Sequence, residues 1–167
     1  MSSETTFDPL ERFAELERLV SKIYFRFSHL FISRPELRDF WWEMAHQEDQ
    51  HASILLACKV LIQNYDDERL DPTISEDKAD ELKAHLLSFL NRGSTDLGIE
   101  EAFRIALQIE TSELDTIYSK LLSLGGPKIA QTMENLGVPA SVQRQKLKAA
   151  LLWFCSDAGL LADAERL

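Results

Sequence analysis

The sequence predicts a soluble all-α fold, a bundle of long helices, and three observations lead to that prediction. Apolar residues recur at alternating steps of three and four along four long stretches, which is the spacing of one helix face. The chain has only 6 Gly and 5 Pro in 167 residues, few for the many turns of an all-β fold. No apolar run approaches the roughly 18 residues that a membrane-spanning helix needs. The length suits one domain, so we expect residues 1–167 to form a single helical domain.

The first two long helices are expected at residues 8–32 and 34–64. Ser33 is placed to cap the second of them, with Glu36 reaching back to the cap. Because the connection between them is short, these helices should form an antiparallel hairpin. The predicted inner face of the first helix carries Leu10, Phe13, Glu17, Val20, Tyr24, Phe27 and Phe31. The predicted inner face of the second carries Leu37, Trp41, Met44, Glu48, His51, Leu55, Cys58 and Ile62.

A polar connection at residues 65–74 follows, and Ser75 should then cap a shorter amphipathic helix that ends near residue 91. The third long helix is expected at residues 99–124, where the two glycines and the proline at 125–127 end it. Its predicted inner face carries Ile99, Phe103, Ala106, Glu110, Glu113 and Ile117.

A short helix up to residue 136 and a fourth long helix from residue 141 to the end of the chain complete the bundle. The predicted inner face of the fourth helix carries Leu147, Leu151, Phe154, Ala158 and Leu161. The adjacent Trp41 and Trp42 cannot both face one core, so one of them needs another surface. Together with the amphipathic fourth helix, this pair favours a homodimer.

The chain is acidic, with a net charge of -10 and a pI near 4.8. This charge argues against a nucleic-acid partner, because phosphates need a basic face. Cys58 and Cys155 are far apart and no Cys-x-x-Cys occurs, which excludes a four-cysteine zinc or iron site. The first residues lack the basic start and apolar run of a signal peptide, so we expect a cytoplasmic protein with free thiols.

Acidic residues interrupt the predicted inner faces of three helices. They are Glu17 on the first helix, Glu48 on the second, and Glu110 with Glu113 on the third; His51 lies on the same face as Glu48. A buried, unpaired carboxylate costs several kcal/mol, so several of them in one core need a shared cation. Helical rise places Glu17 about 22 Å before the end of its helix and Glu48 about 20 Å into the next, at nearly the same height of the hairpin. Glu110 lies about 17 Å into its own helix, at mid-bundle.

Glu48 and His51 form a Glu-x-x-His pair, whose members project from one helix face and can bind the same ion. Mixed carboxylate and imidazole ligation suits iron or manganese, and zinc less distinctively. The motif alone is weak, and its position on the apolar face at the height of Glu17 gives it weight. The sequence therefore predicts a metal site built from the long helices.

These residues resemble the ligand pattern of the ferritin-like superfamily, and within it the rubrerythrin-like branch. Glu17 with Tyr24 matches the family's first helix, Glu48 with His51 its second, and Glu110 its third. Glu113 matches the additional third-helix Glu of rubrerythrins. The resemblance covers most of the chain and implies a four-helix bundle with a long crossover between the second and third long helices. The segment 63–98, with its extra short helix, is long enough for that crossover.

The fourth helix departs from the family pattern, which brings a second Glu-x-x-His there. This helix has no His and no Glu before Glu165. Counting along it places Trp153, Phe154, Cys155 and Asp157 at site height, of which Asp157 or Cys155 can contribute one ligand. The resemblance therefore implies one or two metal ions, and the second position lacks the ligands that the family's fourth helix supplies for chemistry with two irons.

The resemblance implies a metal-binding protein with iron as the first expectation, and manganese or zinc as alternatives. If the protein is an enzyme, the implied class is a non-haem iron oxidoreductase acting on peroxide, O2 or ferrous iron. No catalytic residue is expected apart from the ligands, and Tyr24 and Asp157 are expected beside them. Reducing equivalents would have to come from an electron-donor protein, because no electron-transfer module is present in the sequence.

Two other functions stay open. In the first, the bundle holds no metal and serves as a structural or interaction module, with Lys120, Arg144, Lys146 or Lys148 neutralising the acids. In the second, the protein stores iron, which needs a closed shell of many subunits.

Overall fold

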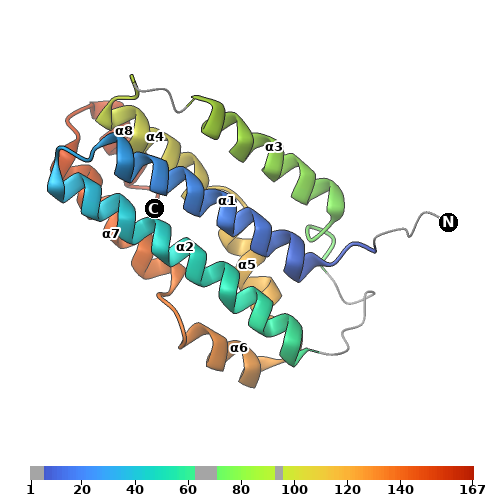
Figure 1. The fold of residues 1–167 in the computed structure, drawn as a ribbon. Helices are drawn as coiled ribbons and strands as arrows, with labels where there is room; N and C mark the ends of the chain where they lie inside the picture. The colour runs from blue at the N-terminus through green and yellow to red at the C-terminus, as the bar shows by residue number, and fades with distance from the viewer. Residues whose placement is uncertain (1–5, 63–70, 93–95) are drawn as a thin grey trace.

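The computed structural model describes residues 6–62, 71–92 and 96–167, and in these ranges it is built of helices with no β-strand (Figure 1). The all-α prediction is therefore confirmed. The α-helices are α1 (Pro9–Leu30), α2 (Pro35–Leu61), α3 (Glu76–Arg92), α4 (Ile99–Glu110), α5 (Leu114–Leu122), α6 (Pro127–Glu134), α7 (Ala140–Phe154) and α8 (Ala158–Ala164). Within the described ranges, none of these helices is long and apolar enough to cross a membrane.

The beginnings of α1 and α2 follow from a proline in each first turn. Asp8 caps α1, where its side chain accepts the N–H groups of Leu10 (3.0 Å) and Glu11 (3.3 Å). The cap expected at Ser33 is wrong, because α2 begins at Pro35 and the capping position falls on Arg34, which makes no side-chain cap. Proline suits the first helical position, since its missing N–H would have no partner there.

The helices α1 and α2 form the predicted antiparallel hairpin. The Ser21 hydroxyl donates to the Ala45 carbonyl (2.8 Å), and further along α1 the Ser28 hydroxyl donates to the Arg38 carbonyl (3.0 Å). The expected inner faces of both helices are buried against the core. Trp41 lies in the middle of that core, with its ring 4.8 Å from the ring of Phe103 on α4.

The helix α3 returns the chain to the end at which α1 and α2 are joined (Figure 1). It lies beside α1 and runs in the same direction, since Arg12 pairs with Asp80 and Arg26 with the carbonyl of Leu90. The expected cap at Ser75 is confirmed, because its hydroxyl accepts the N–H of Lys78 (3.1 Å). Much of the polar connection expected at residues 65–74 lies outside the described residues.

The third long helix is not continuous, contrary to the prediction. The helix α4 ends at Glu110, and α5 begins at Leu114. Between them, the hydroxyl of Thr111 donates to the Leu107 carbonyl and that of Ser112 donates to the Ile109 carbonyl, both at 2.6 Å. Such local hydrogen bonds compete with the helical pattern and favour a break.

The fourth long helix is also shorter than predicted. The helix α7 ends at Phe154, because the backbone of Cys155 is extended (φ -112°, ψ 150°) and Asp157 caps the separate helix α8. The helix α7 runs antiparallel to α2, since Gln143 bonds to Glu48 and Lys146 pairs with the earlier Glu43. The helices α1, α2, α7 and the α4–α5 pair thus pack around a shared core.

Candidate metal centre

Two carboxylates and one imidazole meet in the interior between α1 and α2. Glu17 comes from the middle of α1, and Glu48 and His51 project from one face of α2. Their side chains are 1%, 2% and 1% exposed. One potential ligand atom from each lies within 4.8 Å of the other two. We call Glu17, Glu48 and His51 the ligand cluster. The structure therefore brings together three of the predicted ligands, as the helical-rise argument expected.

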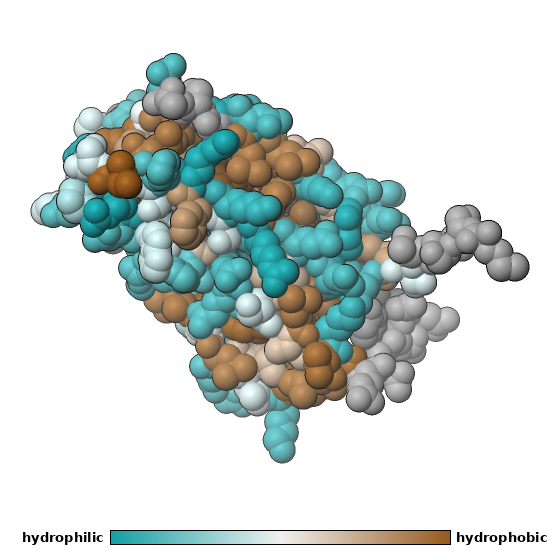
Figure 2. Space-filling model, viewed as in Figure 1, coloured by the Kyte–Doolittle hydropathy of each residue, from teal (hydrophilic) through white to brown (hydrophobic). Residues whose placement is uncertain are grey.

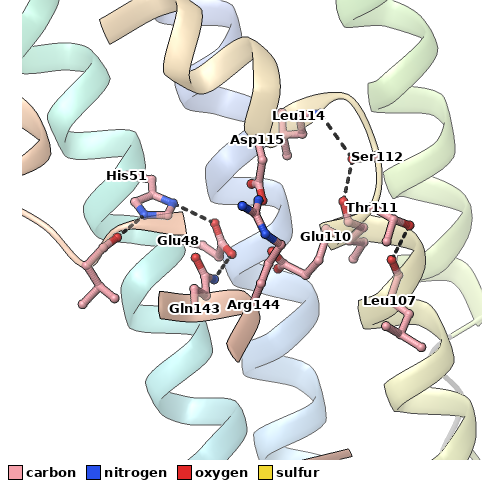
Figure 3. Close-up of polar contacts among 12 residues, drawn as sticks. Glu48, His51, Leu107, Glu110, Thr111, Ser112, Leu114, Asp115, Gln143 and Arg144 are labelled. Carbon is pink, nitrogen blue, oxygen red and sulfur yellow. Dashed lines mark hydrogen bonds and ion pairs between the residues drawn. The ribbon is translucent and has the colours of Figure 1, made fainter. Parts of the chain in front are cut away.

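The two nitrogens of His51 have different partners. The Nε2 atom lies 3.1 Å from the carbonyl oxygen of Val138, and the Nδ1 atom lies 3.3 Å from Glu48 Oε2 (Figure 3). A carbonyl oxygen accepts but never donates, so Nε2 carries the proton in this bond. Nδ1 faces the carboxylate of Glu48 and donates to it when His51 is protonated; burial opposes that charge, but the hydrogen bond and the charge of Glu48 raise the pKa of His51. A cation bound between the carboxylates would replace the proton on Nδ1 and take its lone pair, while Nε2 keeps its hydrogen bond to Val138.

Several buried oxygen atoms around the ligand cluster have no hydrogen-bond donor among the described residues. They are both carboxylate oxygens of Glu17, Oε2 of Glu110 and Oε1 of Gln143. Each is an acceptor, and a buried acceptor without a donor costs roughly 1–3 kcal/mol. A cation held by the ligand cluster would be a partner for the oxygens of Glu17.

Glu110, the last residue of α4, faces the ligand cluster from a second direction. It is 4% exposed, and its Oε1 accepts a hydrogen bond of 2.6 Å from the hydroxyl of Tyr24. Tyr24 is fully buried and lies on the same face of α1 as Glu17. The structure thus places Tyr24 beside a predicted ligand, although Glu110 lies outside the three residues whose ligand atoms converge.

Burial and mutual repulsion govern the protonation of these acids. Burial, and then the charge of Glu48, raise the pKa of Glu17 well above its ordinary value. Burial and the charges of Glu48 and Asp115 likewise raise the pKa of Glu110. Burial opposes ionisation of Glu48 as well, but its hydrogen bond to and attraction for His51 lower the pKa of Glu48. Without a cation, Glu48 thus carries the negative charge, while Glu17 and Glu110 retain protons to higher pH.

Gln143 on α7 is the residue of the site that the sequence interpretation missed. It is fully buried, and its amide donates to Glu48 Oε1 (Figure 3). The expected site height on the fourth helix, at residues 153–157, is therefore wrong. That height was counted along a helix running to the end of the chain, whereas α7 ends at Phe154. The available signal was that Gln143 lies one turn before Leu147, on the same face of α7 as Leu147 and Leu151.

Asp157 does not lie beside the ligand cluster. Its side chain caps α8 by accepting the N–H of Leu160 (2.9 Å), and its own N–H donates to Glu100 (3.2 Å). Glu100 is in the first turn of α4, about 15 Å of helical rise from Glu110. Cys155, the other candidate on this segment, precedes the same turn.

Glu113 does not join the site either. Its side chain is 57% exposed and pairs with Lys78 on α3 (3.1 Å). The break after Glu110 changes the helical register, so that Glu113 no longer shares a face with Glu110. The expectation that both glutamates of this segment face one ion is thus corrected for Glu113.

The basic residues that could neutralise the acids pair elsewhere in the described part of the chain. Lys120 contacts Asp71 (2.9 Å), Lys146 contacts Glu43 (2.5 Å) and Lys148 contacts Glu165 (3.4 Å). Arg144 contacts Asp115 (3.0 Å), which opens α5 directly after the break. Burial and the charge of Glu48 raise the pKa of Asp115 to about 6, and Arg144 opposes that rise. None of these ion pairs includes Glu17, Glu48 or Glu110.

No family model, curated protein or solved structure matches the chain. Within the described residues, Glu17, Glu48 and His51 are the group of acidic, His and Cys side chains whose ligand atoms converge. This arrangement can offer two carboxylates and one imidazole to a single cation, with Glu110 nearby.

Proposed function

We propose that the chain is a ferritin-like, metal-binding protein in which Glu17, Glu48 and His51 hold a metal ion. The observation that carries the proposal is Glu17, whose two carboxylate oxygens are buried beside Glu48 and have no donor among the described residues. A cation bound between these residues would supply the missing partner and remove the repulsion between the two carboxylates. The basic side chains of Lys120, Arg144 and Lys146 pair with other acids, so none of them neutralises Glu17 or Glu48.

The arrangement of the helices supports the ferritin-like assignment. The pair α1 and α2 is antiparallel, α3 carries the chain back along α1, and α7 runs antiparallel to α2. This is the order that a four-helix bundle with a long crossover requires, with α4 and α5 together forming the third member. The ligand cluster lies on the inner faces of the first two members, where that family carries its metal.

Iron is the metal that we propose first, with manganese next and zinc after it. Two hard carboxylates and one imidazole suit Fe(II) and Mn(II), and they leave coordination positions for water or a substrate. Bound iron would supply one-electron chemistry toward O2 or peroxide, which makes the proposed activity that of a non-haem oxidoreductase supplied with electrons by another protein. In that setting Tyr24 would orient Glu110 toward the ion through its hydrogen bond.

Metal analysis of purified protein tests this proposal. Protein prepared without chelator is loaded anaerobically with ferrous iron, and bound iron is measured by mass spectrometry after removal of free ion. We expect about one ion per chain, because three ligands converge on one position. Glu17→Gln should lower the affinity by about tenfold or more, since it removes one anionic ligand. Anomalous scattering at the iron edge would place the ion between α1 and α2.

Glu113→Gln is the matched control for Glu17→Gln, because the same chemical change is made at an exposed carboxylate. It should leave the bound iron unchanged. Iron at background level in the wild-type protein would contradict the proposal.

A metal-free bundle that serves as an interaction module is the second candidate. The amide of Gln143, which donates to Glu48, favours it, because a neutral donor already satisfies one oxygen of that carboxylate. Protonation of Glu17 and Glu110 would then replace the cation. The background-level outcome of the iron experiment supports this function.

A homodimer is also proposed, with the outer face of the α1–α2 hairpin as its contact. The half-exposed rings of Phe25 and Trp42 lie there with their centroids 6.3 Å apart. Figure 2 shows apolar atoms gathered in several patches among hydrophilic ones on the side of the molecule drawn there. Light scattering distinguishes a dimer from a monomer and from the closed shell that iron storage requires.

A further inference from the structure

A pocket of about 660 Å³ lies between α5, the loop before α7 and the first turn of α7. The residues that matter here are Asp115, Tyr118, Val138, Ala140, Ser141 and Arg144, which all line it. Its volume is in the range of pockets that hold small organic molecules. Neither the ligand cluster nor Glu110 lines this pocket.

The inner wall of the pocket is also the outer wall of the ligand cluster. The ring of Tyr118 lies 4.6 Å from the ring of His51, measured between centroids. The carbonyl of Val138 accepts the hydrogen bond of His51 Nε2 (3.1 Å). Asp115 is close enough to Glu48 for their charges to interact. A molecule in the pocket would therefore be separated from the ligand cluster by single side chains.

Hydrogen-bond donors gather at the α7 end of this pocket. Arg144 presents a guanidinium with five N–H groups, one of which donates to Asp115 (3.0 Å). The N–H groups of Ala140 and Ser141 have no acceptor among the described residues, since Pro139 precedes the helix and provides no side-chain cap. The positive end of the helix dipole adds to the charge of Arg144.

Tyr118 adds a second kind of observation. Its side chain lines the pocket and is 7% exposed, and its hydroxyl has no partner in the ranges that the structure describes. The hydroxyl is not one of the fully buried side-chain atoms that lack a partner, so it is open to the pocket and can donate to a polar ligand there. Hydroxyl-bearing Thr116, Ser119 and Ser123 line the same pocket and suit a polar body rather than a hydrocarbon one.

We propose that this pocket binds a small organic acid, whose carboxylate is held by Arg144 and the free N–H groups at the start of α7. A carboxylate matches the planar fork of a guanidinium and the adjacent backbone donors. The ligand takes the place of Asp115 as the partner of Arg144, and its body extends toward Tyr118. The role of this acid as the substrate of the metal centre rests on the proposed function, whereas its binding requires no metal.

Nuclear magnetic resonance of the ¹⁵N-labelled full chain tests the proposal, with succinate and benzoate as probes at millimolar concentration. We expect saturable shifts of the Ala140 and Ser141 amide signals with at least one of the two acids. The uncharged amides succinamide and benzamide should bind at least tenfold more weakly. No saturable shift with either acid would overturn the proposal, and so would equal affinity for sulfate, which shows a general anion site.

Three variants locate the binding. Arg144→Gln should weaken it at least tenfold, while Lys128→Gln, an exposed charge change on α6 outside the pocket, should not. Ala140→Pro removes one N–H at a first helical position, where proline is tolerated, and should weaken binding with the helix intact. Unchanged affinity in both Arg144→Gln and Ala140→Pro would overturn the proposal. If Arg144→Gln is partly unfolded, Ala140→Pro alone decides.

The same titration on chelator-treated protein and on Co(II)-loaded protein separates this inference from the proposed function. Acid binding without any metal binding would support the pocket and contradict the metal centre. Metal binding without acid binding would do the reverse. A change in the visible Co(II) spectrum on addition of the acid, lost in Arg144→Gln, would support the adjacency of the two sites.

Discussion

Tyr24 and Glu110 are joined by a hydrogen bond of 2.6 Å, in which the phenol donates to one carboxylate oxygen. Tyr24 lies on α1 and Glu110 is the last residue of α4, so the bond connects two helices that are far apart in sequence. Both side chains are buried, and the other oxygen of Glu110 has no donor among the described residues. The phenol therefore sets the direction in which Glu110 faces the ligand cluster.

We expect Tyr24→Phe to lower the free energy of unfolding by about 1–3 kcal/mol, because a buried carboxyl group loses its donor while the ring still packs. The ring of Tyr24 lies 5.6 Å from that of Trp41, and phenylalanine preserves this contact. Urea unfolding of the chelator-treated protein measures the change. Ser28→Ala, which removes a hydrogen bond to a backbone carbonyl, is the control and should cost about 0.5–1.5 kcal/mol. A Tyr24→Phe protein as stable as wild type would contradict this.

Metal binding should stabilise the folded chain, because the three ligands converge only when α1 and α2 are packed together. At a free ion concentration 100 times the dissociation constant, the expected gain is about 2.7 kcal/mol. Thermal unfolding with and without Fe(II) or Mn(II) measures it. The gain should disappear in Glu17→Gln and persist in Glu113→Gln. A metal-dependent rise of equal size in both variants would place the ion elsewhere.

The hairpin of α1 and α2 was predictable because both apolar faces are long and the connection between them is short. The height of Glu17 against Glu48 then depends only on helical rise, which is fixed by backbone geometry. His51 follows Glu48 by three residues and shares its face for the same reason. Three members of the site were therefore accessible from the sequence.

Glu113 was placed wrongly and Gln143 was missed because their positions depend on where helices break. The apolar periodicity continues past Thr111 and Ser112, and it does not reveal that their hydroxyls bond to the preceding carbonyls. The height of Gln143 depends on the loop before α7, which has no periodic signal. The pairing of Asp115 with Arg144 depends on both breaks. Local hydrogen bonds and loop geometry, which hydrophobic patterning leaves open, decided these positions.

The metal-free protein should lose stability as the pH rises from about 4.5 toward neutrality. The pKa values of Glu17 and Glu110 are raised above their ordinary value of 4.5, chiefly by burial, so the folded state holds protons that the unfolded state releases. Stability from a raised pKa is complete below the ordinary value and is lost as the pH passes the raised one. Asp115 acts in the same direction, between its ordinary value of 3.8 and about 6.

Urea unfolding in chelator at several pH values measures this dependence. Glu17→Gln should flatten the curve, since its amide neither titrates nor repels Glu48, and Glu113→Gln should leave the slope unchanged. Saturating metal should reverse the sign of the effect between pH 5 and 7, because the ligands must be deprotonated to bind. If the free energy of unfolding of the metal-free chain instead rises steadily from pH 5 to 7, Glu17 and Glu110 ionise freely and the prediction is wrong.

Gln143→Glu should make the metal-free chain less stable and its metal binding tighter. The variant replaces the amide that donates to Glu48 by a fourth carboxyl group in the same buried site. Repulsion between two buried carboxylates favours a shared cation, as it does for any pair that cannot both ionise alone. The urea midpoint in chelator should fall, the Fe(II) affinity should rise by about tenfold, and a second ion becomes possible because Glu110 faces the same space. Gln145→Glu, the same change at an exposed position of α7, is the control and should alter neither quantity. Unchanged metal affinity in Gln143→Glu would mean that residue 143 lies too far from the ion to bind it, which would contradict this prediction.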